Sequence, residues 1–252
     1  MRKFLVLLGT TVLSSAIVAG TASAAEAGRF YARGEVNYNF AGKATTKDGV
    51  SITAKGKTES HTTETKDKNN SKGIGFGAGI GYNVTDQIRT EAMFQYATLK
   101  PKVDKDSDSK KQPKIKSFGL LLNAYYDINN TGSFIPYVMG GIGYGRTKLD
   151  IPTEVLDAKY RETTWKFSEV LKPKSTNNFL WNVGAGAAVE LQKGMYLDIG
   201  YRFGNVGKIK FEDVSNLDNG KTGDDKMTLN AKDVSIKNLN KHTIFAGLRV
   251  TF

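Results

Sequence analysis

Eight segments of this chain alternate large apolar side chains with polar or small ones, most of them over ten or more consecutive residues. Alternation with a period of two is typical of β-strands that have two different faces. The segments are residues 30–40, 73–84, 88–97, 118–128, 134–145, 179–191, 196–203 and 243–252. Because no helical period follows residue 24, the pattern predicts an all-β fold.

The connections between these segments alternate between short and long. Residues 85–87, 129–133 and 192–194 are predicted tight turns, rich in Asn, Asp, Gly and Thr. The four long, polar connections are roughly Ala41–Lys72, Lys100–Lys116, Thr147–Asn177 and Gly204–Lys241. In an antiparallel meander, this rhythm places every long connection at the same end. Connections of this length usually carry function.

The eight strands and their connections predict a closed antiparallel barrel, and two kinds of barrel fit this pattern. A lipocalin-like barrel turns its apolar face inward, whereas a transmembrane barrel turns it outward to lipid. The interior of eight strands is barely wide enough for side chains. Here the polar face is also the small one, with glycine at every second position from Gly73 to Gly81, and aromatic residues lie near strand ends on the apolar face. The sequence therefore favours a transmembrane β-barrel.

Charged residues recur on the small face, which the transmembrane arrangement places inside the lumen. Buried charges require partners, so we expect these side chains to pair. The predicted lumen charge network comprises Arg33, Glu35, Arg89, Glu91, Glu190, Asp198, Arg202 and Arg249. It could line a small pore, but in so narrow a barrel a plug is the expected result.

Residues 1–24 form a predicted signal peptide. Arg2 and Lys3 precede an apolar run, and Ala22-Ser23-Ala24 matches the small-x-small cleavage pattern. We expect cleavage after Ala24, which leaves residues 25–252 as the barrel. An uncleaved anchor helix is the alternative, but Thr and Ser residues interrupt the apolar run.

The strand sequences also resemble a known family. Phe252, with Val250 and Leu248 before it, looks like the carboxy-terminal signal that the barrel-assembly machinery reads. Phe118–Ile128, Ile135–Tyr144 and Tyr196–Phe203 are similar to blocks of the opacity-type surface antigens, and the rickettsial adhesins look closest. The resemblance implies a Gram-negative outer membrane, periplasmic termini, extracellular loops, and binding to host-cell or serum proteins. It transfers no binding residue, because the loops match no family motif.

Composition argues against catalysis. The chain has no Cys, which excludes a thiol nucleophile and thiolate metal sites, and only two His residues, which makes a zinc or copper site implausible. His61, beside Ser60, is the one candidate base for an enzyme at the barrel rim, but a solvated loop histidine explains it as well. His242 is expected in the interfacial zone. No catalytic residue, cofactor or metal is predicted.

The net charge of +11 is concentrated in the first two long connections, which carry net charges of +3 and +4. Such a field attracts anions, here lipopolysaccharide phosphates, sulfated glycans or acidic host proteins. Nucleic acid is not expected outside the cell. A self-repelling, solvated loop coat is the alternative.

The third long connection supplies side chains of the types that dominate binding hot spots. The candidates are Tyr160, Arg161, Trp165 and Phe167, although Trp165 and Phe167 could instead pack within the loop or against the membrane interface. The combined hypothesis is a monomeric surface adhesin that acts through its loops. A small pore or structural barrel and, less favoured, a rim-located lipid-modifying enzyme are the alternatives.

Deleting Phe252 is expected to reduce outer-membrane insertion, because this residue ends the chain and its assigned role is recognition during assembly. Immunoblots of membrane fractions would measure the inserted protein, and Phe252→Tyr serves as the aromatic control. Normal surface levels of the truncated chain would contradict the assignment.

Overall fold

The computed structural model describes residues 27–41, 43–54, 57–68, 71–101, 113–128, 134–150, 157–160, 163–166, 173–218 and 227–252. The predicted signal peptide therefore lies outside the described residues. Every regular element within them is a strand. Among these residues, no helix is long and apolar enough to cross a membrane.

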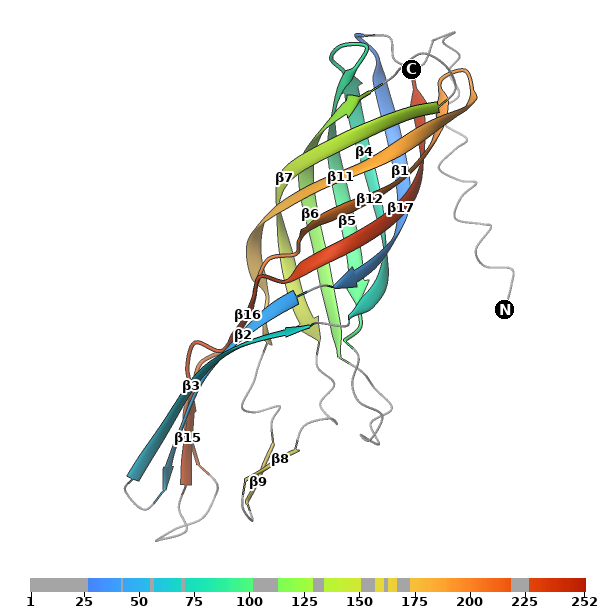
Figure 1. The fold of residues 1–252 in the computed structure, drawn as a ribbon. Coiled ribbons are helices and arrows are strands. Elements are labelled where there is room, and N and C mark those ends of the chain that lie inside the picture. The colour runs from blue at the N-terminus through green and yellow to red at the C-terminus, as the bar shows by residue number, and fades with distance from the viewer. Residues whose placement is uncertain are drawn as a thin grey trace, which may run out of the picture.

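Eight strands close into one antiparallel barrel (Figure 1). They are β1 (Phe30–Ala41), β4 (Lys72–Asn83), β5 (Ile88–Leu99), β6 (Lys114–Asp127), β7 (Phe134–Asp150), β11 (Thr176–Gln192), β12 (Met195–Asn205) and β17 (Asn240–Thr251). Each pairs with its neighbours in the meander, and β1 pairs with both β4 and β17 to close the barrel. All eight predicted segments coincide with these strands, so the predicted fold is confirmed.

The two ends of the barrel differ as the connection lengths predict (Figure 1). At the turn end, the chain termini of the barrel meet, and the Phe252 amide donates to the Phe30 carbonyl oxygen at 2.9 Å. The first tight turn is held by the Thr85 hydroxyl, which accepts from the Ile88 amide at 2.9 Å. The predicted turn 129–133 lies outside the described residues. We call the opposite end, where the long connections emerge, the loop end.

The large apolar side chains point away from the lumen. Ile74 is 72% exposed, Leu122 64% and Phe134 60%, although all three lie in the middle or at the end of paired strands. The lumen side of the same strands is buried and largely polar. This arrangement excludes a lipocalin-like barrel and agrees with a wall that faces lipid.

The glycines of β4 make room for the large residues of β1. The register pairs them one to one: Tyr31↔Gly81, Arg33↔Gly79, Glu35↔Gly77, Asn37↔Gly75 and Asn39↔Gly73. A Cβ atom on Gly77 would lie 3.0 Å from Cγ of Glu35. The alternate glycines are thus explained by packing inside a narrow lumen, as the sequence predicted.

Several barrel strands extend further toward the loop end than expected. β6 begins at Lys114 instead of Phe118, β7 continues to Asp150, and β11 begins at Thr176. Alternating apolar residues mark only the part of a strand that contacts lipid, whereas the hydrogen-bonded ladder continues beyond it. Several lysines assigned to loops, such as Lys116, therefore lie on the barrel wall.

Three of the long connections contribute strands to a second sheet beyond the loop end, which we call the extension sheet (Figure 1). Its seven strands are β2 (Lys43–Ala54), β3 (Lys57–Lys68), β10 (Pro173–Lys174), β13 (Ile209–Phe211), β14 (Val214–Asp218), β15 (Met227–Ala231) and β16 (Ser235–Lys237). The third connection carries a separate hairpin, β8 (Asp157–Tyr160) and β9 (Thr163–Lys166). The sequence did not predict these strands.

Gly79→Val is expected to destabilise the barrel by about 1–3 kcal/mol, because the lumen around Gly79 has no space for added atoms. A Cβ at this position would lie 2.8 Å from the Ala92 carbonyl oxygen. The unfolding midpoint, read from the heat-dependent mobility of the barrel in detergent gels, measures the effect. Ala78→Val adds similar bulk on the exposed face of the same strand and is the control. An equal fall of the unfolding midpoint in both variants would contradict the packing explanation.

Candidate functional site

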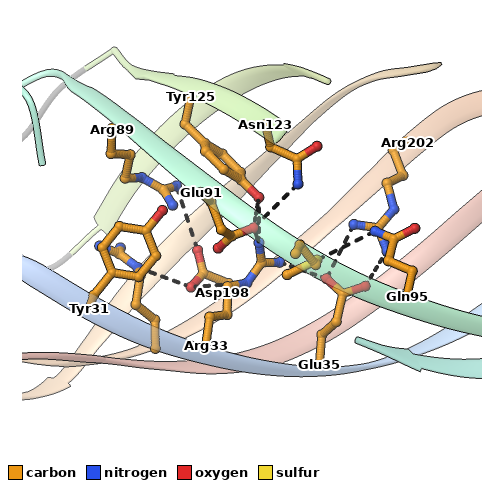
Figure 2. Close-up of polar contacts among 12 residues, drawn as sticks. Tyr31, Arg33, Glu35, Arg89, Glu91, Gln95, Asn123, Tyr125, Asp198 and Arg202 are labelled. Atoms are coloured by element: carbon orange, nitrogen blue, oxygen red, sulfur yellow. Dashed lines mark hydrogen bonds and ion pairs between the residues drawn. The ribbon is translucent and has the colours of Figure 1, made fainter. Parts of the chain in front are cut away.

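The middle of the lumen holds four arginines and four carboxylates, all buried, so their formal charges balance. Figure 2 labels six of them: Arg33, Glu35, Arg89, Glu91, Asp198 and Arg202. They come from β1, β5, β6, β12 and β17. The eight residues, which we call the lumen network, are Arg33, Glu35, Arg89, Glu91, Asp127, Asp198, Arg202 and Arg249.

Glu35 is one centre of the lumen network. Its carboxylate accepts from Arg33 at 2.9 Å and from Arg202, whose two terminal nitrogens both contact it. Asn37 donates to the same carboxylate at 3.2 Å. Arg33 also donates to the Tyr125 hydroxyl at 2.7 Å, and that hydroxyl donates to Glu91 at 2.7 Å (Figure 2). Strands β1, β5, β6 and β12 are thereby linked across the lumen.

Asp198 is the second centre. One oxygen lies 3.2 Å from Nε of Arg249, and Arg89 and Arg33 approach the carboxylate at 3.8 and 3.9 Å. Arg89 also donates from Nε to both oxygens of Asp127 at 3.2 Å. Three positive charges therefore converge on one buried carboxylate.

Aromatic rings fill the spaces between the charged groups. Arg89 lies over the rings of Tyr125 and Tyr137, at 4.0 and 4.8 Å from their centroids. Arg249 lies 4.3 Å from the Tyr196 centroid, and Arg202 lies 4.7 Å from that of Phe245. Such cation–π contacts stabilise guanidinium groups away from water.

Seven of the eight predicted network residues meet in the lumen. The prediction was wrong for Glu190, which lies beside the turn after β11 and accepts only from the Tyr196 hydroxyl, at 3.1 Å, among the described residues. The prediction also missed Asp127 and the tyrosines. Asp127 follows Tyr125 on the polar face of the same segment, two positions along the strand, so the same pattern could have identified it.

A small apolar cluster closes the lumen at the loop end. Residues from the barrel wall pack against residues within or beside the extension sheet: Leu99, Ile115, Leu149, Val206, Ile209 and Leu239. The Thr147 hydroxyl donates to the Val206 carbonyl oxygen at 2.7 Å and ties this lid to the wall. Below it, near Arg202, lies a void of about 20 Å³, about the space of one water.

The extension sheet joins segments that are far apart in the sequence. Strand β2 pairs with β3 along its full length on one side and with β15 and β16 on the other. Among the described residues, β3 has no second partner strand, so a twelve-residue strand forms the edge of the sheet. Free edges are templates for pairing with another chain.

The β8–β9 hairpin contains two of the four predicted anchors. The register pairs Tyr160 with Thr163 and Ala158 with Trp165, which places Tyr160 and Trp165 at positions on the same face. Arg161 and Phe167 lie outside the described residues. Whether any of these four binds a partner stays a prediction.

The two histidines lie in different surroundings. His61 belongs to β3 in the extension sheet, paired with Val50. His242 stacks on Phe40 with centroids 5.1 Å apart, lies 5.0 Å from the Phe203 ring, and contacts the Tyr201 hydroxyl. His242 thus belongs to an aromatic cluster near the loop end of the wall, as expected for an interfacial position.

At the other end of β17, Phe252 and Leu248 are 50% and 37% exposed on the apolar wall. Val250 lies between them on the same outward face. Their predicted role in assembly is not tested by this placement. Among the described residues, no group of three or more His, Asp or Glu side chains could hold a metal ion.

Asp198→Asn is expected to destabilise the barrel by about 3–5 kcal/mol, because it leaves three buried arginines without their shared carboxylate. The unfolding midpoint in detergent gels is the measurement. Glu190→Gln, which also removes one carboxylate from β11–β12 but outside the lumen network, should change the midpoint little. Equal midpoints for the two variants would show that the ion pairs do not hold the barrel together.

Comparisons with known proteins agree with this architecture. The family model described as outer membrane protein beta-barrel domain matches residues 9–252. The outer membrane protein PagN of Salmonella typhimurium is 32% identical over 89 residues, which cover 35% of this chain and 34% of PagN. An uncharacterized protein of Brucella abortus is 25% identical over 205 residues, covering 69% of this chain and 66% of that protein. The chain thus aligns with about a third of PagN and just under two thirds of the Brucella protein.

Among solved structures, the outer membrane protein OprG from Pseudomonas aeruginosa is similar, with a TM-score of 0.51 at 15% identity, covering 92% of this chain and 99% of OprG. At this identity the likeness concerns the fold alone. The match over residues 9–252, on a closed barrel of eight strands with an apolar outer wall, shows that this chain belongs to the outer membrane protein beta-barrel family and resides in the outer membrane.

Proposed function

We propose that this protein is a surface-exposed adhesin that binds host-cell or serum proteins through the structures at its loop end. The observation that carries the proposal is the extension sheet, in which strands from three long connections form one surface beyond the membrane wall. In this proposal the loop end is extracellular, both termini are periplasmic, and the barrel acts as a monomer after insertion by the assembly machinery.

The extension sheet offers a physical mode of binding. An extended peptide can add to a free sheet edge through main-chain hydrogen bonds, with side chains giving specificity. β3 provides such an edge, and residues Lys57–Ser60 at its start are exposed. The charges of the β2–β3 hairpin nearly balance, with five lysines against four acidic residues in its strands. Shape and edge pairing therefore support specific binding here more than a concentrated positive field does.

The β8–β9 hairpin offers a second mode. Tyr160 and Trp165 share a hairpin face, and aromatic residues of this kind dominate binding hot spots. The resemblance of the strands to the rickettsial adhesins supports the same function, although it names no binding residue.

The pore alternative is less well supported. The lumen network fills the middle of the barrel, the apolar lid covers the loop end, and the void between them holds about one water. A continuous water-filled path would require these groups to move. We expect no stable single-channel conductance in planar bilayers; a reproducible conductance would favour the pore.

The direct test is attachment to host cells by a non-adherent bacterium that displays the full-length protein. Two variants remove one candidate surface each: a short Gly-Ser turn in place of residues 151–172, or in place of residues 43–68. Surface levels and heat-dependent gel mobility confirm that each variant is folded. If attachment is unchanged when both surfaces are removed together, the adhesin proposal fails and a structural barrel takes its place.

If the hairpin anchors the partner, Trp165→Ala should weaken binding by about 2 kcal/mol or more. Thr164→Ala alters the opposite face of the same strand and should leave binding unchanged. Binding that depends on Trp165 should persist above physiological salt, whereas binding that depends on exposed lysines should fall as the screening length drops below about 8 Å. Equal affinities of both variants would remove the hairpin from the proposed site.

A further inference from the structure

Exposed cations gather on one part of the barrel wall, just beyond the aromatic residues at its loop end. We call these six residues the basic belt: Lys72, Lys100, Lys114, Lys116, Arg146 and Lys148. Five of them were assigned to loops by the sequence, but the structure places them on or directly beside β4, β5, β6 and β7.

The strand register arranges the belt. On β6, the outward positions run from Phe118 to Lys116 and Lys114, and on β7 from Tyr144 to Arg146 and Lys148. Phe118 pairs with Arg146 and Lys116 with Lys148. The two neighbouring strands add Lys72 and Lys100, whose backbones lie opposite each other in a β-bridge. At strand spacings of about 4.8 Å, the six cations lie on a patch roughly 15 Å wide.

The belt covers only one side of the barrel. On β11, β12 and β17, the first outward residues beyond the aromatic or histidine positions are Asn177, Asn205 and Asn240. A general preference for lysine just outside the membrane would place a cation at this position on every strand. Their concentration on four adjacent strands instead indicates a site for one anionic partner.

Asp150 is the one carboxylate among the described residues that pairs with the belt, at 2.6 Å from Lys116 and 3.5 Å from Lys148. The hydrogen bond from Lys116 lowers the pKa of Asp150, so this carboxylate stays charged. It neutralises one of the six positive charges and leaves an excess of five.

The surface beneath the belt fits lipid chains. The outward residues of β6 continue as Phe118, Leu120 and Leu122, all exposed. About 20 Å along the strand from Lys116, given about 3.3 Å per residue, the wall is hollowed by an apolar groove of about 580 Å³ that Leu122 and Ile142 help to line. A molecule with an anionic head group and several acyl chains would contact the belt and this wall together.

We propose that the basic belt binds the phosphorylated head group of a glycolipid in the outer leaflet, with the acyl chains lying along β4–β7. The chemistry recognised is a phosphate close to the membrane plane, where lysine and arginine form charge-assisted hydrogen bonds to phosphate oxygens. This inference does not depend on host-cell attachment.

The test uses the full-length barrel in phosphatidylcholine nanodiscs, alone, with lipopolysaccharide that carries its lipid A phosphates, or with phosphatase-treated lipopolysaccharide. A ligand that binds only the folded barrel raises its unfolding midpoint. We expect a rise of about 4 °C with the phosphorylated form and none with the phosphatase-treated form.

The triple variant Lys116→Gln, Arg146→Gln, Lys148→Gln should lose this rise. Its matched control, Lys174→Gln, Lys208→Gln, Lys210→Gln, removes three exposed cations from the β10–β13 side of the loop end and should retain it. The charge-preserving variant Lys116→Arg, Lys148→Arg should also retain it, which keeps the test decisive if the first variant folds poorly.

Three outcomes would overturn the proposal. The belt variant could retain the rise, the phosphatase-treated lipid could act as well as the phosphorylated one, or the Arg variant could lose the rise while still folded. A soluble sulfated polysaccharide that raises the midpoint more than the lipid, and only when the belt is intact, would also overturn it, since the belt would then serve a host polymer.

Discussion

An eight-stranded barrel leaves room in its lumen for side chains and for little else, and this chain divides that space unevenly between neighbouring strands. β1 contributes large polar residues, and β4 contributes glycine opposite each of them. The space gained there admits guanidinium and carboxylate groups in equal number, and the aromatic rings around them take the place of water. Closure and charge pairing depend on each other, because the network links strands that meet only in the closed barrel.

Because the lumen is filled, the chemistry of the protein lies on its outer surfaces. One surface is the wall, where aromatic residues and then cations follow each other along β6 and β7. Another is the extension sheet, which stands beyond the apolar lid. The two differ in charge: the wall concentrates cations on one side, whereas the strands of the β2–β3 hairpin interleave both signs. Because of this difference in charge, the wall and the extension sheet are suited to different partners.

The sequence predicted the barrel because lipid imposes a period of two on every strand that crosses it, and residues such as Leu120 and Ile142 display that period. It predicted most of the lumen network for the same reason, since a charge such as Asp198 between outward apolar residues must face inward. The extension sheet has no such signature, because β2 and β3 are mostly polar and show no regular alternation of apolar residues. Glu190 was misplaced because alternation gives the face of a residue but not its depth along the strand.

The pairing of β2 with β16 joins residues 188 positions apart in the chain, such as Lys47 and Ser235. These two connections become neighbours only when the first and last barrel strands meet, so the outermost sheet can be completed only after the closing seam has formed. Its surface is therefore a discontinuous epitope: an antibody that spans β2 and β16 would recognise the assembled protein and ignore its unassembled chain. Antigenic drift in one connection would also be constrained by the other, because each supplies half of the same ladder.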